Sequence, residues 1–195
     1  MSIVNEKVKL WTFQHYDFYK DVMEHGIACC TKKSFMWDDC SEAFEWMAQK
    51  MHERVGNPEM SEAYMPVWAW HTCYGRLKRK PRRSIDHFDS DNSELVFMEL
   101  EIPRDRILVS DFSLWHLPLN GVGIGNDEGV PCKSTWDRIF DPTFNDKDWV
   151  NGDWEDRCLQ ATFWCLHKED IVYADLLQKQ EGSRRLKVKR LYSRK

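Results

Sequence analysis

Residues 94–102 read ELVFMELEI, and this stretch decides the fold class. Apolar side chains occupy every even position from 96 to 102, while Glu99 and Glu101 stand between the later ones. A period of two is typical of a β-strand that buries one face in a core. We therefore expect a strand here, with its even-numbered side chains in the interior.

Further stretches with a β-type pattern lie on both sides of it. They are 8–13 (VKLWTF), 65–73 (MPVWAWHTC), 107–110 (ILVS), 159–166 (LQATFWCL) and 186–192 (LKVKRLY). The third is short and ends at Asp111, the fourth is nearly all apolar and should be buried, and the last is a basic edge strand or a tail.

Helical periodicity is confined to three places. A helix is expected over 17–25, capped by Asp17 and ended by Gly26, and another over 41–55, capped by Asp39 or Ser41. A short helix is expected around 135–140. Two early helices followed by mostly antiparallel strands predict an α+β fold. We expect residues 1–195 to form a single compact domain, with helices near the N-terminus packed on a split or strongly twisted sheet.

Although the net charge is −4, the sequence contains two strongly basic segments. Residues 76–83 (RLKRKPRR) and 184–195 (RRLKVKRLYSRK) hold 13 of the 28 lysines and arginines and none of the 32 acidic residues. Such segments suit a polyanionic partner, and the phosphate-contacting candidates in the first are Arg76, Lys78, Arg79, Lys80, Arg82 and Arg83. The bland alternative is that both segments are only solvated. We also expect the first segment and the acidic cluster 153–156 to flank one cleft if they form a site.

Several classes of protein are disfavoured by composition and motifs. No apolar run is long enough to span a bilayer and the first residues do not form a signal peptide, so a cytoplasmic protein without membrane contact is expected. Seven cysteines without a C-x-x-C pair favour reduced thiols and no metal. The glycines of 120–131 lack the strand, helix and G-K-[ST] context of a nucleotide loop, so we expect a loop that either is merely flexible or moves over a ligand.

Polar residues interrupt the apolar strand 159–166 at two positions. Gln160 and Thr162 share one face with Trp164. A buried amide must find hydrogen-bond partners, so Gln160 either ties down the backbone of a neighbouring loop or lines a cleft with Thr162. In the second case Glu155 and Asp156 lie beside the cleft and Trp164 forms its floor.

Aromatic residues beside polar ones also mark the first and middle strands. Thr12, Gln14 and His15 end the first strand, and Trp68 and Trp70 share one face of the middle strand. Tryptophan pairs at this spacing usually belong to a core, but flat aromatic surface beside polar groups also suits an adenine or nicotinamide ring.

Taken together, these residues resemble an uncharacterised bacterial domain family. The features that carry the resemblance span nearly the whole chain: LWTFQ at 10–14, PVWAW at 66–70, KP at 80–81, SDF to WH between 110 and 116, and QATFW at 160–164. This resemblance brings no activity with it.

A more distant similarity does suggest an activity. The order of a polar first strand, a helix ended by Gly26, an aromatic middle strand and a late strand with Gln160 before the turn 168–171 is similar to the compact ADP-ribosyltransferase fold. In that fold the first strand holds NAD, the middle strand packs on it, and the late strand orients the ribose and the acceptor.

The resemblance assigns candidate roles by position. The first strand would contribute Thr12, Gln14 or His15, the middle strand Trp68, Trp70 or His71, and the catalytic position would be Gln160 or Glu155, with Thr162 beside the cofactor. No arginine stands on the first strand, and the late position holds glutamine where glutamate is usual in that fold.

Two functions of different classes follow as expectations. The first is an NAD-dependent ADP-ribosyltransferase-like enzyme, such as a bacterial toxin or phage-defence effector that modifies nucleic acid or protein. Such an enzyme would bind an antitoxin or another partner protein. The second is a non-catalytic nucleic-acid-binding domain, in which the basic segments contact phosphates and exposed tryptophans stack on bases.

Overall fold

The structure is a computed structural model that describes residues 6–32, 41–73, 75, 78–81, 94–125, 131–150, 152–180 and 185–194. Its strands are β1 (Lys7–His15), β2 (Ile27–Cys29), β3 (Val67–Thr72), β4 (Glu94–Pro103), β5 (Leu108–Asp111), β6 (Leu159–Phe163), β7 (Cys165–His167), β8 (Ile171–Lys179) and β9 (Leu186–Ser193). Its helices are α1 (Tyr16–His25), α2 (Ser41–Arg54), α3 (Phe112–Leu119) and α4 (Cys132–Thr135), with short 3₁₀ turns η4 (Arg104–Arg106), η5 (Trp136–Phe140), η6 (Trp154–Asp156) and η7 (Lys168–Asp170).

The strands form a large sheet and a small one. The large sheet has the order β5-β6-β3-β1-β4-β8-β9, and the small sheet pairs β2 with β7. Every pair of neighbours runs antiparallel. The predicted α+β class, with a mostly antiparallel and split sheet, is therefore confirmed.

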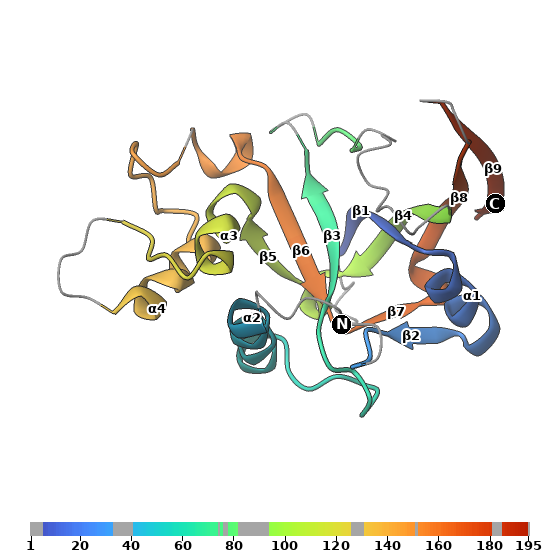
Figure 1. The fold of residues 1–195 in the computed structure, drawn as a ribbon, viewed down its shortest axis with the longest axis horizontal. Helices are drawn as coiled ribbons and strands as arrows, with labels where there is room; N and C mark the ends of the chain where they lie inside the picture. The colour runs from blue at the N-terminus through green and yellow to red at the C-terminus, as the bar shows by residue number, and fades with distance from the viewer. Residues whose placement is uncertain are drawn as a thin grey trace.

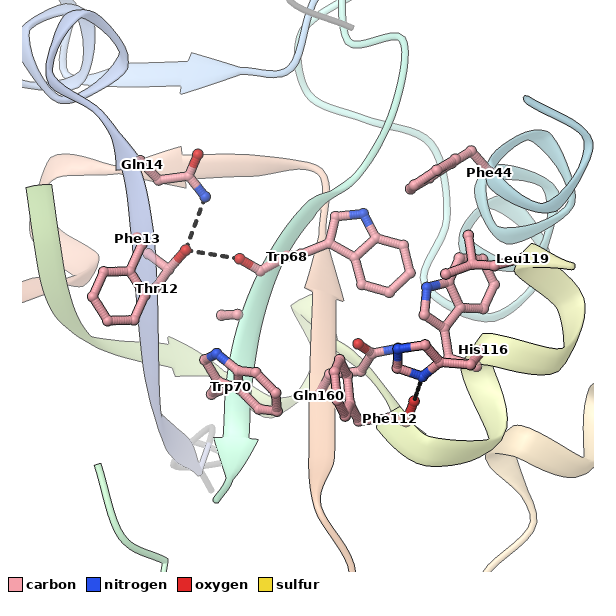
Figure 2. Close-up of a pocket in the computed structure, with 12 residues that line it drawn as sticks. Thr12, Phe13, Gln14, Phe44, Trp68, Trp70, Phe112, His116, Leu119 and Gln160 are labelled. Atoms are coloured by element: carbon pink, nitrogen blue, oxygen red, sulfur yellow. Dashed lines mark hydrogen bonds between the residues drawn. The ribbon is translucent and has the colours of Figure 1, made fainter. Parts of the chain in front are cut away.

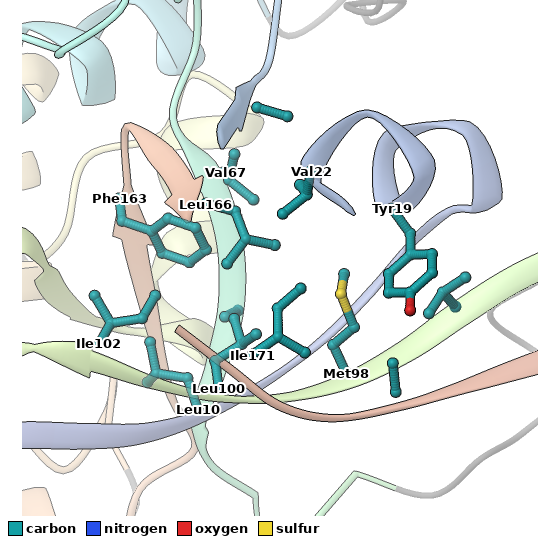
Figure 3. Close-up of a cluster of buried hydrophobic side chains, with 14 of the residues drawn as sticks. Leu10, Tyr19, Val22, Val67, Met98, Leu100, Ile102, Phe163, Leu166 and Ile171 are labelled. Atoms are coloured by element: carbon teal, nitrogen blue, oxygen red, sulfur yellow. The ribbon is translucent and has the colours of Figure 1, made fainter. Parts of the chain in front are cut away.

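Helices cover opposite faces of the large sheet at its two ends (Figure 1). On one face, α1 and the small sheet close over a core that includes Tyr19, Val22 and Leu166 (Figure 3). The alternating residues of β4 lie in this core, since the even positions from 96 to 102 are fully buried. On the other face, α2 and α3 pack over β5, β6 and β3, with Met47, Met51 and neighbouring aromatic side chains between them.

Strand β1 has two very different neighbours in the middle of the sheet. It pairs with β4 over nine consecutive residues, from Lys7 opposite Pro103 to His15 opposite Leu95. With β3 the register contains the single pair Trp11–Trp70. The sheet is thus continuous on one side of β1 and opens on the other.

The structure corrects three details of the predicted elements. The stretch 159–166 is not one strand: it breaks at Trp164, whose indole Nε1 donates to the carbonyl of Gly56 at 2.7 Å, and the chain passes from β6 into the small sheet. Helix α3 was not predicted, so the helices are not confined to the N-terminal part. His15, not Asp17, is the N-cap of α1, whereas Gly26 ends that helix at φ 82° as expected. Asp39 lies outside the described residues.

The basic C-terminal stretch forms the edge strand β9 rather than a tail. Its pairing with β8 extends from Leu186 to Ser193. Two of its basic side chains are held by acids, because Arg190 pairs with the buried Asp175 at 2.8 Å and Arg194 pairs with Glu101 at 3.2 Å. Lys187 and Lys189 stay exposed.

Candidate functional site

A cavity of about 380 Å³ opens where β1 and β3 separate. It lies on the face of the sheet that α2 and α3 cover (Figure 2). The described residues that line it are Thr12, Phe13, Gln14, Phe44, Trp68, Ala69, Trp70, Phe112, Trp115, His116, Leu119 and Gln160. Five of the predicted site residues are among them: Thr12, Gln14, Trp68, Trp70 and Gln160.

Side chains replace the missing backbone pairing at this opening. The Thr12 hydroxyl Oγ1 donates to the carbonyl oxygen of Trp68 at 2.8 Å. The Gln14 amide Nε2 in turn donates to Thr12 Oγ1 at 2.8 Å (Figure 2). A short hydrogen-bonded chain therefore links β1 to β3 beside the cavity and fixes the amide of Gln14 at its edge.

Aromatic rings form most of the cavity wall. Trp70 contacts Phe112 with ring centroids 4.5 Å apart, and Trp68 contacts Trp115 at 4.9 Å. Phe44 of α2 meets Trp68 edge-on at 6.0 Å. Each contact joins a β3 side chain to a helix, so the rings are fixed by packing before any ligand arrives.

Gln160 supplies a polar group to this apolar wall. Its amide Nε2 donates to Ser110 Oγ of the neighbouring strand β5 at 3.2 Å, and both residues are buried. Among the described residues, Gln160 thus bonds the side chain of a neighbouring strand and not the backbone of a loop. No described residue donates to Gln160 Oε1, so an acceptor oxygen is left for a ligand in the cavity.

Helix α3 brings the remaining residues to the site. Its N-cap is the buried Asp111, whose carboxylate accepts from the backbone N–H groups of Ser113 at 2.8 Å and Leu114 at 3.0 Å. Burial raises the pKa of Asp111, and the bond from Leu114 and the charge of Arg157 oppose that rise. The cap starts the helix so that Phe112, Trp115, His116 and Leu119 face the cavity.

A second cavity, of about 560 Å³, gathers other predicted residues beyond Trp70 on β3. His71, Lys78 and Glu155 line it together with Thr72, Trp154 and Leu159. Burial, and then the charges of Lys78 and Arg104, lower the pKa of His71 to about 4. One residue of the first basic segment and one of the acidic cluster thus share a cavity, but it is not the cavity of Gln160.

Two further predicted residues also lie elsewhere. His15 lines a third cavity, of about 480 Å³, which adjoins the first because Gln14 and Trp68 line both. Thr162 is fully buried beneath α2, where its single hydroxyl hydrogen has two acceptors within reach, the carbonyl oxygen of Leu108 at 3.3 Å and Met51 Sδ at 3.2 Å. Neither Thr162 nor Trp164 lines the Gln160 cavity, so the cleft predicted around them was wrong in that part.

The first basic segment is described only in part. Arg76, Arg82 and Arg83 lie outside the described residues. Lys80 pairs with the buried carboxylate of Glu99, and the backbone of Arg79 bridges to Cys73. The nine described tryptophans are all buried or half-buried, so none of them presents a fully exposed ring.

Seven described lining residues of the site were not predicted: Phe13, Phe44, Ala69, Phe112, Trp115, His116 and Leu119. Three of the four on α3 recur at helical spacing from Phe112, and Asp111 before them is a good N-cap. That combination could have revealed the helix. Phe44 lies on the helix predicted over 41–55, but nothing in the local sequence relates that helix to a cavity.

Comparisons with known proteins give a family and no activity. The family described as Domain of unknown function (DUF3841) matches residues 9–131, more than half of the chain, and the chain belongs to it. No curated protein and no solved structure matches. In the described residues, no helix has the length and apolar character required to cross a membrane. The described residues also form no cluster of three or more His, Cys, Asp or Glu side chains able to hold a metal ion.

Proposed function

We propose that this DUF3841 domain binds NAD, or a closely related nucleotide, in the aromatic cavity and acts as an ADP-ribosyltransferase-like enzyme. One observation carries the proposal. The polar residues of β1, the tryptophans of β3 and Gln160 of β6 line a single cavity. These are the three positions to which the resemblance assigns NAD binding, packing on the cofactor and orientation of the ribose.

The shape and chemistry of the cavity suit the nicotinamide end of NAD. Its volume lies within the range of small-molecule sites, and aromatic walls with a few placed polar groups are typical of them. The half-buried rings of Trp68 and Trp70 offer flat surface to a pyridine ring, and the amide of Gln14 can bond its carboxamide. The adjoining third cavity extends this space, and its lining includes His15, Asp17 and Asp21.

The reaction would depend on Gln160. Breaking the bond between nicotinamide and ribose builds positive charge on the ribose, and a fixed dipole aimed at that charge lowers the barrier. Gln160 Oε1 can accept from a ribose hydroxyl or face the developing charge, while Ser110 holds the amide in place. Glu155 lines the second cavity, so in this proposal the catalytic position is Gln160.

Binding of NAD followed by tryptophan fluorescence and calorimetry tests the proposal. Trp70→Ala removes a stacking surface worth about 1–3 kcal/mol and should raise the Kd for NAD by about fivefold or more. Gln160→Ala should lower the rate of nicotinamide release, measured by chromatography, more than it raises the Kd. Gln178→Ala on β8, an amide that bonds Glu94 away from the cavity, is the matched control and should change neither.

The outcomes separate the two functions. If wild type binds no NAD up to millimolar concentration, the NAD proposal is rejected. A nucleic-acid-binding domain would instead require affinity that falls with salt and with charge reversal of Lys187 and Lys189, the exposed lysines of β9. Among the described residues, base stacking in that second function would fall to half-buried tryptophans such as Trp68 and Trp70.

A further inference from the structure

We infer that His116 is the general base that activates the acceptor nucleophile in the Gln160 cavity, an inference that rests on the proposed function. His116 is the only ionisable side chain among the described residues that line this cavity. The residues contributed by β1, β3, β6 and α2 are apolar, aromatic, amide or hydroxyl side chains. Among the described lining residues, proton transfer at neutral pH is therefore left to His116.

The surroundings of His116 fix which ring nitrogen can act. Nδ1 lies 3.0 Å from the carbonyl oxygen of Phe112, one turn earlier on α3 (Figure 2). A carbonyl oxygen only accepts, so Nδ1 carries the hydrogen and the neutral ring keeps its lone pair on Nε2. The ring also stands edge-on to Phe112, with centroids 4.7 Å apart and planes at 88°. The base is thus oriented before substrate binds.

The exposure of His116 places this base at the mouth of the cavity. The side chain is exposed, whereas Gln160 is buried. A nucleophile that arrives from solvent, such as water or the hydroxyl of a target, meets His116 before it reaches the inner wall. A proton taken up by an exposed imidazole can also leave to solvent after each turnover.

With water as acceptor the step balances without a further reactant. The bond between ribose C1′ and the pyridinium nitrogen breaks, and its electron pair neutralises that nitrogen, so nicotinamide leaves uncharged. The water oxygen bonds to C1′ and its proton passes to His116 Nε2. His116 then returns the proton to solvent, and the products are nicotinamide, ADP-ribose and one proton.

The substitution His116→Asn tests this role because an Asn amide can still donate to Phe112 O while Nε2 is lost. General-base catalysis contributes roughly 10²–10⁴-fold, so we expect nicotinamide release to fall by about 100-fold or more with the Kd for NAD changed by less than about twofold. The wild-type rate should rise with pH to a plateau along a single ionisation that the variant lacks. Added imidazole should restore part of the rate to His116→Ala.

The control and the contrary outcomes are distinct. His25→Asn, at the exposed end of α1, should keep both the rate and the pH profile. Normal NAD binding with less than a threefold loss of rate in His116→Asn, or an unchanged pH profile, would overturn the role of His116 and leave the NAD proposal standing. If wild type does not bind NAD, both the NAD proposal and the role of His116 are rejected. If it binds NAD without releasing nicotinamide, the role of His116 is rejected and the binding site stands.

Discussion

The two edges of β1 show how the same strand can close a sheet on one side and open a site on the other. Toward β4, nine consecutive residues are paired, and the backbone donors and acceptors are used up by the ladder. Toward β3, the register contains one pair, and the carbonyl of Trp68 is met by the Thr12 side chain instead. Where backbone pairing stops, side chains must satisfy the backbone, and space remains between the strands.

The side chains at the two edges differ accordingly. Phe97, opposite Phe13 on the β4 side, is fully buried, as are the core residues of β4 on the other face. Trp68 and Trp70 on the β3 side are only half-buried, although they are larger. Aromatic surface that is left uncovered contributes less to stability and is available to a ligand. The paired edge should therefore govern stability and the open edge should govern binding.

The largest expected effect is on the paired edge. Phe97→Ala removes a fully buried ring and should lower the free energy of unfolding by about 3–5 kcal/mol, measured by urea denaturation. Phe13→Ala is the matched control: its ring lies 5.2 Å from that of Phe97 but is half-buried, so the loss should be clearly smaller. Equal losses for the two variants would contradict the assignment of stability to the paired edge.

A smaller effect on stability is expected from His71, which follows Trp70 on β3. Its pKa is lowered from 6.5 to about 4, first by burial, so between these values the unfolded chain binds the proton more readily than the folded one. Stability should therefore fall as pH is lowered through this window, by roughly 1–2 kcal/mol after allowance for partial exposure.

The measurement is urea unfolding of wild type and His71→Asn at pH 7, 5.5 and 4.5. As pH falls, the unfolding free energy of wild type should decrease more than that of His71→Asn. The control His25→Asn should keep the wild-type pH dependence, because His71 is still present in it. A constant difference between wild type and His71→Asn would show that His71 titrates alike in the folded and unfolded chains.

The strands could be predicted because their pattern is local, whereas the missed elements depend on distant contacts. The alternation in 94–102 is enough to assign β4 and its buried face. Helix α3, FSLWHLPL, is apolar on most sides, so its apolar pattern alone does not identify a helix, and the N-cap Asp111 is the stronger local signal. The break between β6 and β7 depends on the bond from Trp164 to Gly56, 108 positions earlier in the chain, and the run LQATFWCL contains no turn residue to announce it.

The part of the candidate site that lies on strands could be predicted from the sequence. Period two places Trp68 with Trp70, and a buried amide on a neighbouring strand singles out Gln160. Which strands become neighbours is set by the whole topology, and this is why Glu155 and His71 were grouped with Gln160 although they line another cavity. His116 was not predicted as a site residue because helix α3 was not predicted.

The smallest stability effect is expected for the hydroxyl that bridges the open edge. Thr12→Val keeps the shape of the side chain but removes the donor to Trp68 O and the acceptor for Gln14 Nε2. The cost should be about 1 kcal/mol of unfolding free energy, because cavity water can meet part of the need. Binding of NAD should weaken several-fold, since the amide of Gln14 is no longer held at the edge of the cavity.

Thr162→Val separates the two consequences of losing that hydroxyl. It makes the same substitution on β6, where the hydroxyl bonds Leu108 O beneath α2 and does not line the Gln160 cavity. We expect a comparable loss of stability in urea and an unchanged Kd for NAD in calorimetry. If Thr12→Val binds NAD as wild type does, the bridge only supports the sheet. If both variants weaken binding alike, the effect is one of general stability, and the open edge of β1 does not govern the site.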